Sequence, residues 1–363
     1  MSPSLRFPEF TGEWERCVLG DVLEFSNTRI NSSELNSGNY VSTENILQNF
    51  QGIVKARSIP EDTNVMAFSC GNILLSNIRP YLKKVWKATF NGGCSSDVFV
   101  LQANSNIDAD YLHYVVANDK FIGFVMNGAK GVKMPRGDKN QMKTYSLSLP
   151  SIKEQRKISR FLSFLDERIA VQSRLIDRLQ SLMIGIRHRI INEAKGKIVC
   201  LCEVSDIYQP QTISSADLTE TGYPVYGANG IIGHYTSYNH EAEQVCITCR
   251  GNTCGGVNYT KSKSWITGNA MVVNVDRYQN IVSKRYLYHY LSNCDFNSII
   301  SGSGQPQIVR APLAKFKIIL PTVMQQYKIA HCLDVIQNKI NVNSNILNLL
   351  IRQKQYLLRK MFI

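Results

Sequence analysis

The sequence has few acidic residues and no long apolar segment. It contains 28 Asp and Glu against 41 Lys and Arg among 363 residues, which gives a formal charge of +13 at pH 7. No apolar segment approaches the roughly 20 residues of a membrane-spanning helix, and no basic N-terminal region precedes an apolar run and a cleavage site. We therefore expect a soluble, cytoplasmic protein without a membrane partner. The excess of cations favours a polyanionic partner.

Several motifs of nucleic-acid enzymes are also missing. The sequence lacks an Asn-Pro-Pro-Tyr-like adenine-methylation motif, a Gly-x-x-x-x-Gly-Lys-Ser/Thr phosphate loop and a His-Glu-x-x-His zinc motif. The stretch SIPEDTNV, residues 58–65, resembles part of a nuclease motif but lacks the acid-x-Lys that should follow. We expect a protein that is not an enzyme. The alternative is a stand-alone DNA methyltransferase or nuclease with an unrecognised site.

The ten cysteines do not form the regular framework of a small secreted domain. In a chain of this size we expect them to stay reduced in the cytoplasm. Cys246, Cys249 and Cys254, with His234 and His240 nearby, invite a zinc interpretation, but no second close pair follows. Burial of small apolar side chains explains these cysteines better, so we expect no metal.

The length allows two or more domains, and one segment occurs twice. The stretch LPSIKEQRKISRFLSFLDERI, residues 149–169, recurs 171 positions later as LPTVMQQYKIAHCLDVIQNKI, residues 320–340. Charge is shared as well: residues 1–195 hold 25 Lys and Arg against 19 Asp and Glu, and residues 196–363 hold 16 against 9. Both halves of the chain are basic, so both could face the same polyanion.

Fainter similarities connect the regions before the repeated segment. YLHY at Tyr111 corresponds to YLYHY at Tyr286, GAKGVKMPR at Gly128 corresponds to GSGQPQIVR at Gly302, and Arg79 lies 171 residues before Arg250. Each region combines short β-type runs with a helix near Tyr111 or Tyr286. The runs are residues 73–76, 98–101, 245–248 and 271–275. The fold class predicted is α+β, or mixed α/β, with a pseudo-two-fold internal repeat.

Both copies of the repeated segment predict a long helix. Ser151-x-x-Glu154 and Thr322-x-x-Gln325 match the capping box, in which two unpaired backbone donors at a helix start are satisfied reciprocally. Apolar residues then recur with alternating spacings of four and three, which is a heptad seam. The first helix is predicted at about residues 152–194. The seam residues are Ile158, Leu162, Leu165, Ile169, Gln172, Ile176, Leu179, Met183, Ile186 and Ile190, and then Ile329, Leu333, Ile336, Ile340, Asn343, Leu347, Leu350, Lys354, Leu357 and Met361.

One amide interrupts each seam at the same heptad position, Gln172 in the first helix and Asn343 in the second. A polar amide within an apolar seam lowers stability but selects register and partner number. We therefore predict that the two helices pair as an antiparallel coiled coil. Two separate amphipathic helices, each lying on its own domain, are the alternative. Lys354 replaces the equivalent Met183, which predicts looser packing there.

Two globules held apart by a stiff rod suggest a function. Duplex DNA presents equivalent groove faces about every 34 Å, and pseudo-symmetric proteins use that period. A rigid spacer between two different readers would recognise two short sequences at a set distance. A protein-interaction scaffold whose basic charge is incidental is a further alternative.

Four phrases in each half carry a family resemblance. RFPEFTGEWERCVLGDV, YVSTENIL, GNILLSNIRPYLKKVW and LPSIKEQRKI occur in order in the first half, and YPVYGANGIIGHY, CRGNTCGGV, SWITGNAMVV and LPTVMQQYKIA in the second. The chain resembles the specificity subunit of bacterial type I restriction-modification enzymes over essentially its whole length.

The resemblance implies a non-catalytic DNA-reading subunit with a bipartite, asymmetric target. Residues 1–150 and 196–320 would be target-recognition domains, and residues 151–195 and 321–363 the conserved helices. In the family these helices dock two methylation subunits, which bind S-adenosylmethionine and modify adenine, and motor-nuclease restriction subunits complete the assembly. The chain itself would need no cofactor.

Candidate DNA contacts are basic and amide side chains on glycine-rich or aromatic loops, because cations bind phosphate whereas amides and guanidinium groups read base edges. A solvated charged surface is the alternative for each group. The stretch GANGIIG from Gly227 predicts a turn and contributes Asn229. The first half offers Arg79, Lys83, Lys84, Lys87, Lys130, Lys133, Arg136, Lys139 and Asn140. The second half offers Asn229, Arg250, Asn252, Gln305, Gln307 and Arg310.

Overall fold

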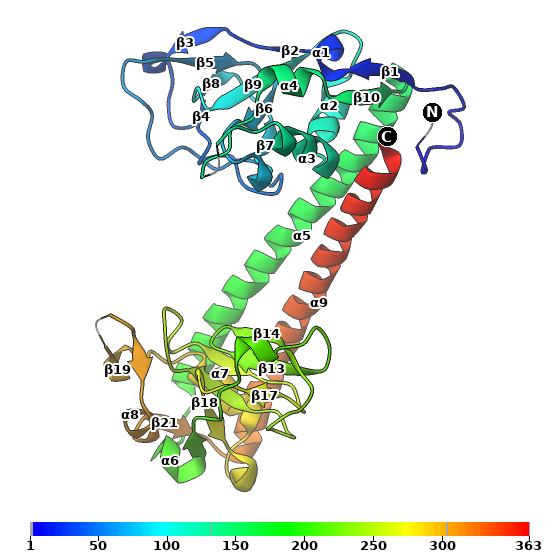
Figure 1. The fold of residues 1–363 in the computed structure, drawn as a ribbon. Helices are drawn as coiled ribbons and strands as arrows, with labels where there is room; N and C mark the ends of the chain where they lie inside the picture. Colours follow the sequence, from blue (N-terminus) through cyan, green and yellow to red (C-terminus); the bar gives the residue numbers. More distant parts are fainter. Residues whose placement is uncertain (1–2, 132, 303, 363) are drawn as a thin grey trace. The chain divides into compact units, whose positions relative to one another are not determined.

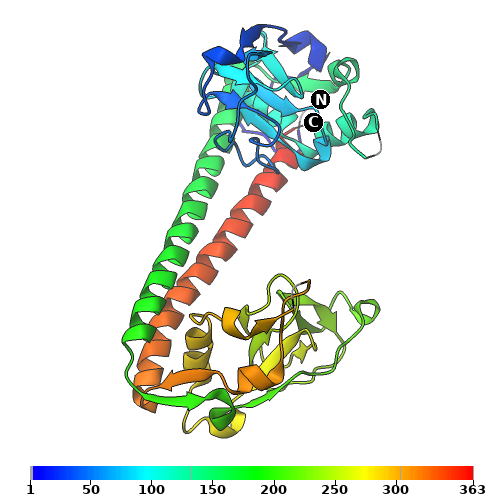
Figure 2. The ribbon, with the colours of Figure 1, turned by 90° about the vertical axis from the view of Figure 1, so that its left-hand side faces the viewer.

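The chain folds into two compact units that share two long helices (Figures 1 and 2). The computed structural model describes residues 3–131, 133–302 and 304–362. Unit 1 comprises residues 1–172 and 346–363, and unit 2 comprises residues 173–345. Helices α5 (Ile152–Glu193) and α9 (Val323–Met361) each contribute to both units. The predicted fold class, two mixed α/β globules with two long helices that pair antiparallel, is confirmed.

Unit 1 contains two four-stranded sheets. The first has the strand order β2-β9-β6-β7 and is antiparallel throughout, and the second has the order β3-β5-β8-β4 with β4 parallel to β8. Strand β1 pairs with β10 beside the start of α5. The strands are β1 (Glu15–Val18), β2 (Leu23–Phe25), β3 (Arg29–Asn31), β4 (Tyr40–Val41), β5 (Asn64–Phe68), β6 (Ile73–Ser76), β7 (Val85–Lys87), β8 (Gly92–Cys94), β9 (Val98–Ala103) and β10 (Ser146–Leu149).

Short helices cover the first sheet of unit 1. They are α1 (Leu19–Val22), α2 (Ala109–Val116), α3 (Asp119–Asn127), α4 (Lys139–Lys143) and the 3-10 turn η2 (Pro80–Leu82). A further 3-10 turn, η1 (Ser32–Glu34), follows β3 of the second sheet. Every residue of β6 is buried, which explains its continuous apolar run, since a strand covered on both faces cannot alternate with polar residues. The predicted strand over residues 73–76 is confirmed.

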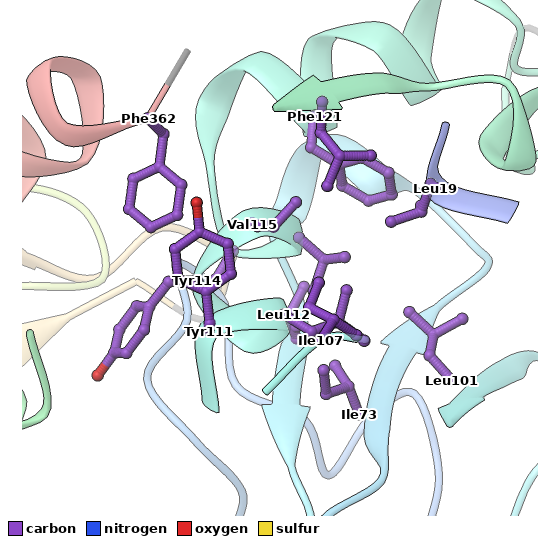
Figure 3. Close-up of a cluster of buried hydrophobic side chains, with 14 of the residues drawn as sticks. Leu19, Ile73, Leu101, Ile107, Tyr111, Leu112, Tyr114, Val115, Phe121 and Phe362 are labelled. Atoms are coloured by element: carbon purple, nitrogen blue, oxygen red, sulfur yellow. The ribbon is translucent and has the colours of Figure 1, made fainter. Parts of the chain in front are cut away.

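The last residues of α9 complete the core of unit 1 (Figure 3). Phe362 is buried and its ring stacks on Tyr111 with centroids 5.1 Å apart. Leu357, Leu358 and Met361 belong to the same buried cluster as Ile158 and Leu162 of α5. The carbonyl of Leu358 accepts a hydrogen bond from Asn118 Nδ2 at 3.2 Å. Residues more than 180 positions apart in the sequence therefore share one apolar core.

Unit 2 repeats this plan with shorter peripheral elements. Its main sheet has the order β12-β18-β15-β16, a second sheet has the order β14-β13-β17, and β11 pairs with β21 as β1 does with β10. The strands are β11 (Lys197–Cys200), β12 (Asp206–Tyr208), β13 (Tyr223–Gly227), β14 (Gly230–Tyr235), β15 (Val245–Thr248), β16 (Val257–Tyr259), β17 (Trp265–Ile266), β18 (Ala270–Asn274), β19 (Ile300–Ser301), β20 (Gln307–Ile308) and β21 (Lys317–Leu320). The helices and turns are α6 (Leu201–Val204), η3 (Ser215–Asp217), η4 (Asp276–Tyr278), α7 (Lys284–Leu291), η5 (Asn297–Ile299) and α8 (Arg310–Ala314).

A polar cluster fixes α7 against α9 in unit 2. Arg285 Nε donates to both oxygens of Asp334 at 3.0 Å, and His289 Nε2 lies 2.7 Å from Asp334 Oδ1. The His289 side chain is fully buried, and burial lowers its pKa to about 4 although the Asp334 carboxylate opposes the shift. Neutral His289 therefore donates its Nε2 proton to Asp334.

The predicted seams are buried where the two helices pair. Every one of the twenty seam residues is buried or half-buried, because an apolar stripe at heptad spacing faces the partner helix. In unit 1 Ile158, Leu162 and Leu165 share a cluster with Leu357 and Met361. In unit 2 Ile191 shares one with Ala330. Antiparallel pairing thus holds within each unit, and separate amphipathic helices are ruled out there.

The capping prediction is confirmed for α9 but is wrong in part for α5. At the start of α9, Thr322 N donates to Gln325 Oε1 at 3.2 Å and Gln325 N donates to Thr322 Oγ1 at 3.4 Å. At the start of α5, Glu154 N reaches Ser151 Oγ at 3.4 Å, but the Glu154 carboxylate accepts two hydrogen bonds from Arg6 at 2.7 and 2.8 Å instead. The buried carboxylate fixes the N-terminal segment onto the helix.

Lys354 is half-buried and paired with an acidic side chain. Its ammonium group lies 2.5 Å from Asp166 Oδ1 and 5.5 Å from the ring centroid of Tyr114, whose hydroxyl also donates to Asp166 at 2.8 Å. The looser packing predicted at Lys354 is therefore replaced by a local polar network in unit 1. Within the described part of the chain, no helix is both long enough and apolar enough to span a membrane.

Candidate nucleic-acid interface

The two basic stretches of unit 1 lie side by side. In one of these stretches, Lys130 and Arg136 form an antiparallel bridge and exchange backbone hydrogen bonds of 3.0 and 2.9 Å. This stretch is hydrogen-bonded to the loop after β6, because Arg79 N donates to Pro135 O at 2.8 Å and Gly137 N donates to Asn77 O at 3.1 Å. Six of the predicted contact residues are thereby gathered on two adjoining loops. They are Arg79, Lys83, Lys84, Lys130, Lys133 and Arg136.

The cations of these loops are mostly exposed, and several form surface ion pairs. Lys83 pairs with Asp119 at 2.6 Å, Lys130 with Asp138 at 3.1 Å, and Arg136 with Asp97 at 3.3 Å. Exposed pairs of this kind contribute about 0–1 kcal/mol, so a phosphate group can replace the carboxylate at little cost. The arrangement can therefore bind a polyanion while remaining compact without one.

Three lysines are less available than the sequence suggested. Lys84 donates to Thr43 O at 2.5 Å, and burial lowers the pKa of its ammonium group against the opposing effect of Glu44. Lys87 forms an ion pair with Asp110. Lys139 lies 5.3 Å from the ring centroid of Phe99. These side chains hold loops in place and are poorer candidates for phosphate contact than Arg79 or Lys133.

Unit 2 brings its predicted residues together in the same way. Strands β19 and β20 form a short hairpin in which Ser301 pairs with Gln307. This hairpin binds the loop after β15, because Gly251 N donates to Pro306 O and Ile308 N donates to Cys249 O, both at 3.0 Å. The predicted contact residues exposed on the two segments are Arg250, Asn252, Gln305 and Gln307, and Arg310 is exposed at the start of α8.

A third segment joins this group. The β13–β14 hairpin carries exposed Asn229 at its tip, and Thr248 Oγ1 at the end of β15 donates to the carbonyl of Ala228. Gly230, at φ +88°, allows this tight turn. The turn predicted from the GANGIIG stretch is confirmed, and the hairpin tip lies beside the loop that carries Arg250.

The two sites are equivalent, with one correction to the sequence alignment. The hydrogen bond from Arg79 to Pro135 corresponds to that from Gly251 to Pro306, so the structural counterpart of Arg79 is Gly251 and not Arg250. Strands β6, β7 and β9 are offset by 172 positions from β15, β16 and β18, since they begin at residues 73, 85 and 98 against 245, 257 and 270. The hairpin turns keep the offset of 171, since Gly131 and Gly302 both have φ +92°.

A segment of unit 1 that carries exposed amides was not predicted. Residues 46–53 form a hairpin-like loop beside η2, and Gln48, Asn49 and Gln51 are exposed on it. Amides close to a basic loop, and Gly52 at φ +89°, could have indicated it, but the tip residues Asn49 and Phe50 are neither glycine nor basic. Among the described residues, no three His, Cys, Asp or Glu side chains are grouped so as to hold a metal ion.

The comparisons with known proteins identify the family of the chain. Residues 11–181 and 194–352 match the family described as type I restriction modification DNA specificity domain. The chain belongs to that family.

Individual relatives are distant. The chain is 31% identical over 148 residues to the EcoprrI specificity subunit of Escherichia coli, and 30% identical over 142 residues to a putative specificity subunit of Haemophilus influenzae. These matches cover 39% and 37% of this chain, and the chain spans only about a third (36%) of either relative's length. The S subunit of a type I system from M. genitalium has a TM-score of 0.70 at 16% identity, covering 100% of this chain and 99% of that one. A chain from a structure of type I complex assembly and conformational transition has a TM-score of 0.57 at 19% identity, with 97% and 98% covered.

Proposed function

We propose that the chain reads a bipartite, asymmetric DNA sequence, with one half-site bound by each unit. The observation that carries this proposal is the equivalence of the two loop clusters. In each unit a glycine-turned hairpin is hydrogen-bonded to the loop after a buried central strand, and both segments expose cations or amides. The exposed residues differ between units, so the two half-sites would differ in sequence.

The two loop clusters differ in the kind of polar side chain that they expose. Unit 1 offers mainly Lys and Arg, which neutralise phosphates, whereas Gln305 and Gln307 of unit 2 can form paired hydrogen bonds with adenine. Arg250 and Arg310 suit guanine. The helices α5 and α9 would set the spacing of the two half-sites.

The same helices carry a second apolar stripe that fits partner subunits. On α9, Val335, Val342, Leu349 and Tyr356 recur every seven residues outside the seam, and each side chain is more than half exposed, at 56, 57, 64 and 57%. On α5, Phe164 and Val171 occupy the equivalent heptad position at 54 and 56%. Exposed apolar residues that recur every seven positions on one helix face indicate a protein interface, because apolar residues scattered singly over a surface would not recur at a fixed interval. We assign this stripe to two methylation subunits.

On this proposal the chain has no catalysis of its own. S-adenosylmethionine would bind the methylation subunits, and motor-nuclease restriction subunits would join the same assembly. The cytoplasm is the expected location.

The test of DNA reading is selection of bound duplexes from a random library by the purified chain, alone and with the methylation subunits. A two-part motif with a fixed gap is expected, and binding should weaken steeply with salt because counterions are released from phosphates. Selection of a single continuous motif, or binding insensitive to salt, would contradict the proposal. Cleavage or methylation of DNA by the chain alone would instead favour an enzyme.

The docking stripe has its own test. Val342→Glu should abolish co-purification with the methylation subunits while the chain stays folded, because the side chain is exposed in the chain alone. Gln180→Glu, at an exposed polar position of α5, is the matched control. Unchanged co-purification of Val342→Glu would show that the stripe is not the interface.

A further inference from the structure

The loop of residues 46–53 in unit 1 is built as a rigid projection. Ile46 and Ile53 form an antiparallel bridge, Leu47 N donates to Gly52 O at 2.8 Å, and Ile46 is fully buried. Phe50 packs against the main core of unit 1. The ends and one side of the loop are thereby fixed, while the amides of Gln48, Asn49 and Gln51 stay exposed.

This loop is attached to the basic segment of the candidate interface. Asn49 N donates to Leu82 O and Phe50 N donates to Lys83 O, both at 3.0 Å. The Lys84 ammonium group donates to Thr43 O, just before the loop. The exposed amides therefore lie beside the loop that carries Arg79 and Lys83.

Backbone conformation singles out the same two segments. Six described non-glycine residues have a positive φ, and four of them are Asn49 (53°), Phe50 (62°), Arg79 (50°) and Lys83 (54°). Residues with side chains rarely adopt this conformation, and bulky Phe even less often than Asn. Such strain persists only where the surroundings hold it, and it concentrates at functional sites. Four of the six strained residues therefore lie in two loops that are hydrogen-bonded to each other.

We infer that the loop of residues 46–53 is a third DNA-reading segment of unit 1, in which Asn49 reads a base edge. The inference rests on the proposed function. Amides can form paired hydrogen bonds with adenine, whereas the neighbouring cations bind phosphate. Unit 2 places Asn229 in a comparable position, because its hairpin tip is bonded to Thr248 next to the basic loop. Each unit would then use an asparagine at a loop tip together with its two other segments.

The test is the DNA motif selected from a random duplex library by the full chain and by Asn49→Gly. Glycine adopts φ +53° without strain, so the loop is retained and only the amide is lost. The preference for one base over the others at one position of one half-site should fall about ten-fold or more. The other half-site and the thermal midpoint should stay unchanged. Asn49→Asp, which keeps the shape but replaces the amide donor by an anion, should weaken binding to that half-site more strongly.

The matched control is Gln102→Ala, which removes an exposed amide near the C-terminal end of β9 in the same unit. It should leave the motif unchanged. If both Asn49 variants select the same motif as the wild type, the inference is overturned but the proposed function stays intact. A wild-type chain that selects no motif would overturn both.

Discussion

Replacing Gly302 by Ala should damage the β19–β20 hairpin of unit 2, which we propose reads DNA, more than it damages folding. Gly302 has φ +92°, and a Cβ atom there would lie 2.5 Å from the carbonyl oxygen of Gln305. A left-handed conformation costs a residue with a Cβ about 1–2 kcal/mol, and the backbone contact forces the hairpin to open or shift. Because a short hairpin can open locally, we expect a loss of at most about 2 kcal/mol in unfolding free energy.

Binding should be more sensitive, because the shifted backbone carries Gln305 and Gln307. Loss of one paired amide contact would lower affinity for the second half-site about ten-fold or more. The assay is titration of a labelled duplex containing the selected motif, together with thermal unfolding. Gly131→Ala, whose Cβ would lie 3.3 Å from Met134 O, should have a smaller effect on the first half-site. Gly304→Ala is the control, with no atom within 4 Å of its Cβ. Equal affinities for the Gly302 and Gly304 variants would refute the reasoning.

Three further predictions concern pH, register and spacing. The pKa of His289 is about 4 in the fold and about 6.5 unfolded, so the unfolded state binds the extra proton between these values. His289 therefore contributes a fall in unfolding free energy of about 2 kcal/mol from pH 7 to pH 5, and buried His113, whose pKa burial also lowers to about 4, adds a fall of its own. His289→Gln should reduce this fall in thermal scans, exposed His331→Gln should not, and equal slopes for wild type and His289→Gln would contradict the burial argument. Changing Gln172 and Asn343 together to Leu should retain or raise the thermal midpoint but loosen register, seen as mixed species on cross-linking; a clear loss of stability would count against their pairing. Inserting seven residues into α5 alone should change the gap between the selected half-sites, and an unchanged gap would show that the helix does not set it.

The long helices could be predicted because their signals are local. The alternating four-and-three spacing of apolar residues from Ile158 onward identifies the buried face of the helix, and it does so without knowledge of the partner. It located both seams correctly. The reciprocal cap at Glu154 failed because Arg6, 148 positions away, takes the carboxylate. No pattern within one turn of helix can reveal such a distant competitor.

In the candidate site, too, local sequence patterns could be predicted and contacts between distant residues could not. Basic and glycine-rich stretches identified the loops at Arg79 and Gly131, since composition is visible in the sequence. The loop at Asn49 was missed because its tip uses positive φ at Asn49 and Phe50, where the sequence has no glycine, although Gly52 follows at φ +89°. Tertiary hydrogen bonds to Leu82 and Lys83 hold that conformation, and these depend on how η2 lies in the folded unit.

The core of unit 1 has a consequence for biosynthesis. Phe362 and Met361 pack against Tyr111 and the cluster that includes Ile158 of α5, so the core of unit 1 is incomplete until residues 357–362 have left the ribosome. Unit 2 is continuous in sequence and can fold while those residues are still being made. The half synthesised first is then the half finished last, and during that delay a nascent chain exposes apolar surface that chaperones would have to shield.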